Sequence, residues 1–459
     1  MFKFLRPTVL LIFTIGIISS CKKADTNVAT TPTAVTPPTP IATDLTKDSV
    51  LINTKNLYLW YNQIPASFDP KSYADPIKIM EAIRPYSIEP GFTGAVDKWS
   101  FGIKKADWNN LISGMSSANA TTNASGDFGI SVFFKVEGDL RVRLVEPASG
   151  AGAAGIQRGW RITKINGNTD ITTSNATFIV DNVYNSTSST ITFLRPDGTS
   201  VDINLTASHY KTKPVYMDSI YSINNKTIGY LVLNSFIGDT TQMDADFQRV
   251  FSKFASNNVT DVIIDLRYNG GGYVSAQQEV ANYLAPYSAN GQLMMKETYN
   301  DKNSQYNLST NFNKKGTLNL SKIYFIVTRN TASASELLIN NLKPFLDEKL
   351  VGPSSTDGKP VGFFPVPVGD YYIFPVSFRS TNHNGEGNYF NGLSVTNSVA
   401  DGLDKNWGDV TESSLASALK HITTGSFVRE GIYNEDPSVH NGNNELSKTS
   451  FVGMLRAHK

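Results

Sequence analysis

The feature that most constrains this fold is an apolar run that leads through a turn of small residues into a helical pattern. Residues 323–327, Ile-Tyr-Phe-Ile-Val, are all β-branched or aromatic, which is typical of a strand buried on both faces. After the turn, the pattern over residues 333–347 predicts a helix. Further strand and helix patterns alternate earlier in the chain, at 228–233, 244–255, 262–266 and after Ser275. This alternation predicts an α/β core.

Ser333 lies where the predicted strand leads into the predicted helix. Unpaired backbone N–H groups and the helix dipole favour negative charge at a helix start, which is the charge that an acyl-transfer intermediate develops on its oxygen. Ser333 is therefore a candidate nucleophile. The string Ser333-Ala334-Ser335-Glu336 also fits the capping box, in which serine and glutamate only satisfy the first turn of a helix.

Lys359 is the candidate base that a serine nucleophile needs. It follows the predicted helix and a short apolar segment, from which a lysine can return to the helix start. A lysine acts as a base only where burial lowers its pKa enough to leave the amine neutral. Val361, Phe363 and Phe364 supply apolar side chains for such a site. The alternative for any single lysine is a solvated surface charge.

A glycine-rich turn follows the predicted strand 262–266, with the sequence Arg-Tyr-Asn-Gly-Gly-Gly. Glycine allows positive φ angles and a close approach of the backbone to a bound peptide. An N–H from Gly270 or Gly271, together with that of Ala334, would form a two-donor oxyanion hole. The alternative is a tight turn that only closes the strand.

These three segments together resemble the C-terminal processing peptidases, the S41-type serine peptidases that combine a Ser/Lys dyad with a PDZ domain. The resemblance rests on Asp265–Gly272, Thr331–Glu336 and Gly358-Lys359, and it covers roughly residues 118–420. It implies a ClpP/crotonase-like α/β catalytic core with an inserted β-rich PDZ-like domain. It also implies a protein or peptide substrate.

By position, the resemblance implies that Ser333 is the nucleophile and Lys359 the general base. It implies that the amides of Gly271 and Ala334 are the oxyanion donors, and that no metal or organic cofactor takes part. The lysine comes one residue later than the usual family spacing. Phe363 stands where a glutamine is often found, four positions after the lysine.

The histidines offer the alternative mechanism, because a related tricorn-like branch uses a Ser/His arrangement. They are far apart and form no metal-ligand spacing: His209, His383, His421, His440 and His458. His209, between the PDZ-like and catalytic segments, is the best candidate base among them. We nevertheless expect a surface or linker role for it.

The first 20 residues predict an export signal. Lys3 and Arg6 precede an apolar run, residues 9–18, that is too short to span a bilayer comfortably. The small residues before Cys21, the only cysteine of the chain, resemble a bacterial lipobox. We therefore expect a lipid anchor on Cys21 in a bacterial cell envelope, at the periplasmic face or the cell surface. The alternative is an ordinary signal peptide with an incidental cysteine.

The remaining segments predict a series of domains. After a Thr/Pro-rich linker over 21–43, they are an N-terminal helical domain (44–117), a PDZ-like domain (118–208), the catalytic domain (209–424) and a polar, flexible tail (425–459). In the PDZ-like domain, the segment containing Phe128, Gly129 and Ile130 is the expected peptide-binding loop, whose amides capture a peptide carboxylate. The alternative is that this domain only packs against the catalytic unit.

Composition excludes some classes of partner and leaves two functions open. A net charge of +1 gives no hint of nucleic-acid binding, and 40% hydrophobic content in 459 residues fits a globular chain of about three domains. We expect an exported, lipid-anchored serine endopeptidase that cleaves protein substrates. The competing class is a non-catalytic peptide-binding lipoprotein with an intact PDZ-like domain.

Overall fold

The structure is a computed structural model that describes residues 41–115, 126–427, 433, 435–447 and 451–456. The predicted export signal, Cys21 and residues 21–40 of the predicted linker lie outside the described residues. Within the described ranges, no helix is both long enough and apolar enough to cross a bilayer. The elements below all lie in one unit, residues 42–459, apart from the first residue of α1.

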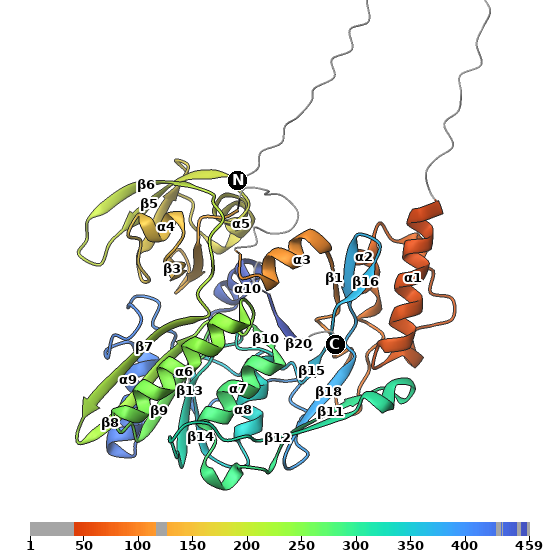
Figure 1. Ribbon diagram of the computed structural model, residues 1–459. Coiled ribbons are helices and arrows are strands. Elements are labelled where there is room, and N and C mark those ends of the chain that lie inside the picture. Colours follow the sequence, from red (N-terminus) through yellow and green to blue (C-terminus); the bar gives the residue numbers. More distant parts are fainter. Residues whose placement is uncertain (1–40, 116–125, 428–432, 434, 448–450, 457–459) are drawn as a thin grey trace, which may run out of the picture. The chain divides into compact units, whose positions relative to one another are not determined.

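Six strands form the central sheet (Figure 1). In order across the sheet they are β19 (Asn397–Ser398), β14 (Asp347–Gly352), β13 (Lys322–Ile326), β9 (Asp261–Asp265), β8 (Lys226–Leu233) and β7 (Val215–Ile223). Neighbouring strands are parallel except β7 and β8, which are antiparallel. Helices alternate with these strands along the chain, so the predicted α/β core is confirmed.

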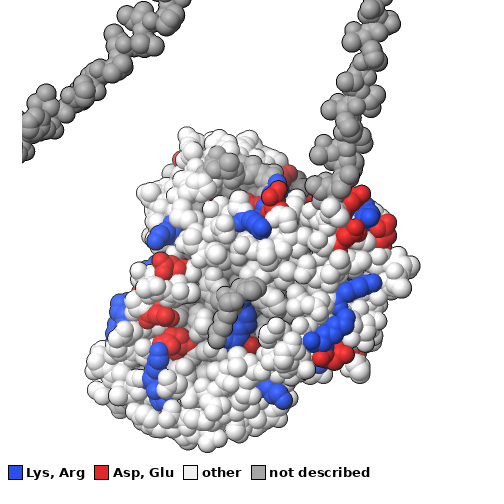
Figure 2. Space-filling model, turned by 45° about the vertical axis from the view of Figure 1, so that its right-hand side comes forward, with Lys and Arg blue, Asp and Glu red and all other residues white. Residues whose placement is uncertain are grey.

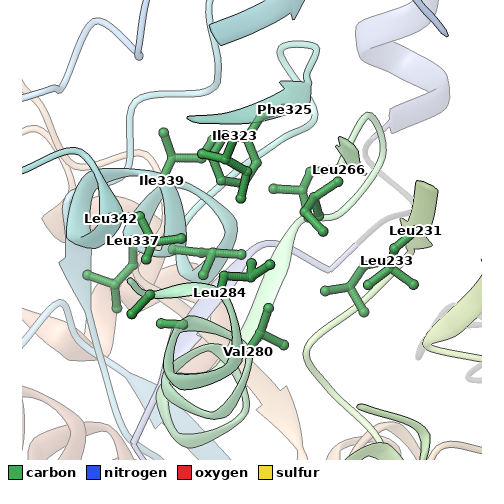
Figure 3. Packing of buried hydrophobic residues seen from close by; sticks show 14 of the residues in the cluster. Leu231, Leu233, Leu266, Val280, Leu284, Ile323, Phe325, Leu337, Ile339 and Leu342 are labelled. Atoms are coloured by element: carbon green, nitrogen blue, oxygen red, sulfur yellow. The ribbon is translucent and has the colours of Figure 1, made fainter. Parts of the chain in front are cut away.

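Alternate residues of β13 face opposite sides of this sheet. Ile323 and Phe325 belong to a core cluster with the helices α6 (Thr240–Ser256), α7 (Val274–Leu284) and α8 (Ala334–Leu342). Figure 3 shows them with residues of α7 and α8 from this cluster. Tyr324 and Ile326 belong to a second cluster with α9 (Ser413–Thr424). Because helices cover both faces, every position of this part of the strand is apolar.

The helix after Ser333 is shorter than the predicted 333–347. It ends at Leu342, with Lys343 as its C-cap, and β14 begins at Asp347. Pro344 explains the early end, because a proline has no N–H to continue the helical hydrogen bonds.

The N-terminal part of the described chain combines helices with a strand. Its helical elements are α1 (Ile41–Leu57), α2 (Pro76–Ile83), α3 (Lys105–Ile112) and the 3₁₀ turns Tyr61–Gln63 and Pro70–Ser72. β1 (Phe101–Lys104) pairs with β17 (Tyr371–Phe374), which also pairs with β16 (Val366–Val368). Residues 101–104 therefore share a sheet with residues that follow Lys359.

A separate antiparallel sheet, which we call the peripheral sheet, fills residues 130–206. Its strands, in chain and spatial order, are β2 (Ile130–Phe134), β3 (Leu140–Val145), β4 (Arg161–Ile165), β5 (Ser188–Leu194) and β6 (Ser200–Thr206). The helical elements between them are α4 (Gly150–Ala153), the 3₁₀ turn Thr173–Asn175 and α5 (Ala176–Val183). The β-rich pattern predicted for this region matches these strands.

A four-stranded sheet lies beside the region that holds Lys359. Its order is β12 (Leu308–Asn311), β11 (Leu293–Tyr299), β18 (Phe378–Asn382) and β15 (Val361–Gly362), with the 3₁₀ turns Tyr287–Ala289 and Asp301–Tyr306 before β11 and β12. All its neighbouring strands are antiparallel.

The prediction of a flexible tail after residue 424 is wrong for the described residues. α10 (Pro437–Ser447) buries Val439 and Leu446 in the core of the peripheral sheet, and β20 (Gly453–Leu455) pairs in parallel with β10 (Gly271–Tyr273). A few apolar anchors in a polar stretch hold this part of the chain, which a search for periodicity does not detect.

Charged side chains are mixed on the molecular face shown in Figure 2. Lysine and arginine side chains alternate there with aspartate and glutamate, in keeping with the net charge of +1.

Candidate active site

Ser333 occupies a strained turn between β13 and α8. Its φ of 61° and ψ of −112° are a conformation that non-glycine residues rarely adopt and that tends to occur at functional sites. The residue is fully buried, and its hydroxyl has no hydrogen-bond partner in the described part of the chain. Ser333 and Glu336 do stand in the geometry of a capping box. The hydroxyl nevertheless makes no hydrogen bond of normal geometry to the helix start, so it remains available as a nucleophile.

Glu336 organises the loops around Ser333. Its Oε2 accepts the backbone N–H of Ser333 and that of Lys359, both over 2.8 Å. Its Oε1 accepts the Gly358 N–H over 2.7 Å and the Thr356 hydroxyl over 2.5 Å. Burial raises the pKa of Glu336 to about 7, and the hydrogen bonds from Thr356, Lys359 and Ser333 oppose that shift because they favour the carboxylate. From the sequence, Glu336 was interpreted only as half of a capping box.

Lys359 is fully buried, not a surface charge. Burial lowers the pKa of its amine to about 7, against the opposing fields of Asp357, Asp97 and Glu336. Its Nζ lies 3.7 Å from the centroid of the Phe363 ring, so Phe363 is confirmed as part of the apolar wall. Nζ donates to the carbonyl oxygen of Val452 over 3.3 Å. Near pH 7 the amine is therefore divided between its neutral and charged forms, and it is not hydrogen-bonded to the serine.

Gly271 lies against both Ser333 and Ala334. It has a φ of 103°, and a Cβ added to it would lie 2.9 Å from Ser333 Cβ and from the Ala334 nitrogen. The N–H of Gly271 donates to Asn269 Oδ1 over 2.9 Å. This bond leaves the N–H groups of Gly270 and Ala334 as the predicted oxyanion donors that no described residue already engages.

A buried ion network holds the strand end before the glycine turn. The Arg267 guanidinium lies 2.6 Å from Asp265, 3.0 Å from Asp401 and 2.8 Å from Glu412. Arg158, which precedes β4, bonds to Asp401 over 3.0 Å and to the hydroxyl of Tyr268 over 2.9 Å. The network therefore ties the peripheral sheet to the turn, a connection that no spacing in the sequence indicates.

The three residues of the predicted peptide-binding loop lie in different environments. Gly129 and Ile130 line a cavity of about 230 Å³ that extends to Gly270. Phe128 is 1% exposed and belongs to the core of the peripheral sheet. The Gly129 N–H, predicted to capture a peptide carboxylate, donates to the side chain of Asp127 over 2.7 Å.

Within the described residues, no histidine forms the alternative Ser/His pair with Ser333. Because the Ser333 hydroxyl has no hydrogen-bond partner among the described residues, no histidine within them is paired with it. His421 instead shares a hydrogen bond of 2.7 Å with the hydroxyl of Tyr324. His458 lies outside the described residues.

Comparison with known proteins finds a family match over the region that holds the candidate site. Residues 227–395, which include the glycine turn, Ser333 and Lys359, match the family model of peptidase family S41. This part of the chain is a peptidase family S41 region. A relative within the match is the carboxy-terminal processing protease CtpB of Bacillus subtilis (strain 168), which is 26% identical over 168 residues. That alignment covers 35% of this chain and 32% of the relative, so the chain spans about a third of the relative's length.

One solved structure extends the likeness in fold beyond the matched residues. A putative S41 protease from Bacteroides fragilis NCTC 9343 superposes with a TM-score of 0.65 at 24% identity, over 82% of this chain and 97% of the other. The photosystem II D1 C-terminal processing protease gives a TM-score of 0.47 at 18% identity, over 78% and 93%. The first of these likenesses shows that the S41 fold extends over most of the chain.

Proposed function

We propose that this S41 chain is a serine endopeptidase in which Ser333 is the nucleophile and Lys359 the general base. The observation that carries the proposal is the combination of a free, buried hydroxyl on a strained turn with a buried amine whose pKa is lowered to about 7. Glu336 holds the backbone of both residues. These features are what a Ser/Lys dyad needs before its side chains meet.

In the proposed first step, Lys359 Nζ takes the proton of Ser333 Oγ while Oγ bonds to the carbonyl carbon of the substrate. The peptide C–N bond then breaks, the proton passes to the leaving amine, and an ester remains on Ser333. Water hydrolyses this ester, with the same amine accepting the proton of the water and returning it to Oγ. Nζ must first break its hydrogen bond with the Val452 carbonyl and turn toward Ser333 Oγ. Catalytic hydrogen bonds commonly form or shorten only when substrate binds.

The oxyanion of each tetrahedral intermediate is assigned to the glycine turn and the start of α8. The N–H of Ala334 and an N–H of Gly270 or Gly271 are the proposed donors. Gly270 and Ala334 are the more direct candidates, because Asn269 already accepts the N–H of Gly271. Loss of one such donor typically costs about a hundred- to a thousandfold in rate.

The peripheral sheet is proposed to be a PDZ-like domain that engages the substrate peptide. The cavity that joins Gly129 and Ile130 to Gly270 supports this role, because a peptide held there would lead toward the proposed oxyanion site. The named activity of the relative CtpB, carboxy-terminal processing, is consistent with a substrate held near its C-terminus.

Residues 1–21 are proposed to direct export and lipid attachment at Cys21, which would hold the enzyme on a bacterial envelope membrane. The apolar run followed by small residues and a single cysteine supports this. A Cys21→Ser variant should leave the membrane fraction and lose incorporation of a labelled fatty acid. Unchanged membrane association and labelling would contradict the anchor.

Digestion of casein by the purified chain tests the proposed activity. The native protein should cleave casein, whereas Ser333→Ala and Lys359→Ala should lose essentially all cleavage while keeping their circular dichroism spectra. Equal cleavage in all three would assign the activity to a contaminant. Equal absence of cleavage would favour the competing function, a peptide-binding lipoprotein.

A further inference from the structure

Residues 451–456, which we call the channel segment, run through the candidate active site in an extended conformation. β20 of this segment lies parallel to β10, with Gly453 opposite Gly271 (Figure 1). The Gly453 N–H donates to the Gly270 carbonyl over 2.9 Å. β10 starts within the glycine turn, so the segment pairs with the backbone that is proposed to hold a substrate.

The other edge of the channel segment pairs with the region after Lys359. The Phe363 N–H donates to the Met454 carbonyl over 2.9 Å, and the Arg456 N–H donates to the Phe363 carbonyl over 3.1 Å. One edge therefore meets the proposed oxyanion turn, and the other meets the residue whose ring covers the Lys359 amine. An extended peptide that binds by adding a strand to a sheet edge makes backbone hydrogen bonds of the same kind.

The peptide groups of the channel segment lie among the proposed reacting groups. Lys359 Nζ donates to the Val452 carbonyl over 3.3 Å. A Cβ added to Gly271 would overlap the Gly453 carbonyl oxygen, on the same side as Ser333 Cβ and the Ala334 nitrogen. A reacting carbonyl must lie within about 3–3.5 Å of the nucleophile, so a substrate strand and the segment compete for this space.

The side chains of the channel segment indicate which substrate side chains fit the peptide channel, by which we mean the space that this segment fills. Met454 and Leu455 are 0% and 1% exposed. The Arg456 guanidinium bonds to both carboxylate oxygens of Glu297, each over 2.9 Å from Nε. Glu297 is itself 1% exposed. The channel therefore accommodates two apolar side chains followed by a basic one.

We propose that the channel segment is an intramolecular ligand of the peptide channel, which an extended substrate with apolar residues before a basic one must displace. The expected effect of the segment on catalysis rests on the endopeptidase function proposed above. When only a fraction of molecules has an open channel, the apparent affinity for substrate falls by that fraction. The segment should thus raise KM and leave kcat unchanged.

Binding of a free peptide tests the proposal without relying on catalysis. In the Ser333→Ala background, fluorescence anisotropy compares the full chain with a chain that ends at Ser447, using a labelled Phe-Val-Gly-Met-Leu-Arg peptide. The shortened chain should bind the peptide at least tenfold more tightly than the full chain. Equal or weaker binding by a shortened chain that keeps its circular dichroism spectrum would overturn the proposal.

A charge reversal in the full chain covers the case in which shortening unfolds the protein. Arg456→Glu places a carboxylate against Glu297 and should expel the segment, which would lower KM about tenfold or more with kcat unchanged. Lys315→Glu, which disrupts a partly exposed ion pair with Glu279, is the matched control and should change neither constant. An unchanged KM or a reduced kcat in Arg456→Glu would assign the segment to the permanent fold.

The two proposals fail in different ways. If neither the native chain nor any variant cleaves casein, the endopeptidase proposal fails. Peptide binding to the Ser333→Ala chains still decides the role of the segment. If the shortened chain does not fold, Arg456→Glu in the Ser333→Ala background takes its place. If casein is cleaved and the segment variants match the native KM and peptide affinity, the endopeptidase proposal stands and the intramolecular ligand is excluded.

Discussion

Ser333 and Lys359 are joined through a single atom, because the backbone N–H groups of both residues donate to Oε2 of Glu336 over 2.8 Å. Two loops that are far apart in the sequence thus meet at one carboxylate. The other oxygen of that carboxylate holds Gly358 and Thr356. Glu336 is therefore a positioning residue for the proposed dyad, and its carboxylate is hydrogen-bonded to neither reacting side-chain atom.

The variant Glu336→Gln should lower kcat/KM about a hundredfold, because a misplacement of about 1 Å can cost that much. An amide has one acceptor oxygen in place of two, so at least one pair of donors is left facing an NH₂ group. Removing the carboxylate should also lower the pKa of the acid limb of the pH–rate profile, since Glu336 helps to raise the pKa of Lys359.

The control for this change is Glu81→Gln, which alters an exposed ion pair with Lys78. It should leave both kcat/KM and the pH profile unchanged. A Glu336→Gln variant with a native pH profile and native rate would show that the carboxylate does not position the dyad.

Activity should rise with pH through about 7, because Lys359 serves as a base only when its amine is neutral and burial lowers its pKa to about 7. Below that pH, kcat/KM should fall about tenfold per unit. Lys359→Arg should be inactive at every pH tested, since a guanidinium stays protonated. An acid limb near the ordinary lysine pKa of about 10.4 would contradict a desolvated base.

The same burial should make Lys359 a cost to stability. Its pKa is about 7 in the folded chain and about 10.4 when unfolded, so between these pH values the unfolded chain binds more protons and stability rises with pH. The penalty is complete below pH 7 and absent above about 10.4. Lys359→Met should therefore be more stable than the native chain at pH 7, by on the order of 1–4 kcal/mol.

Thermal unfolding at pH 7 and pH 10 measures this effect. The gain in Tm from Lys359→Met should be large at pH 7 and should shrink toward pH 10. Lys315→Met is the control, and it should lower Tm at pH 7. The hydrogen bond with Glu279 raises the pKa of Lys315, and the variant loses this stabilising pair. A Lys359→Met chain less stable than native at pH 7 would show that the amine contributes to the fold.

The parts of the site that the sequence could predict depend on local patterns. The apolar run before Ser333 indicates a strand covered on both faces, and the small residues after it indicate a turn into a helix; both follow from neighbouring residues. Gly271 needs a positive φ angle, and a run of glycines indicates where such a residue is allowed.

The parts that could not be predicted depend on contacts between distant residues. Glu336 has the spacing of a helix cap, and its bonds to Thr356, Gly358 and Lys359 exist only once β14 has returned the chain to the helix start. The channel segment contributes a strand of only three residues, too short for any periodic signal. Its pairing with β10 arises from tertiary structure alone.

The variant Gly271→Ala should lower kcat about a hundred- to a thousandfold, a loss comparable to removing an oxyanion donor. Its methyl group would overlap the Gly453 carbonyl and lie 2.9 Å from Ser333 Cβ and the Ala334 nitrogen, at a φ of 103°. Gly198→Ala is the matched control, because its φ of 84° imposes similar backbone strain with no atom within 4 Å of the added methyl. Both variants should lose about 1 kcal/mol or more of stability, and only Gly271→Ala should lose activity. Equal kcat in the two variants would show that the space beside Ser333 is not where the substrate carbonyl binds.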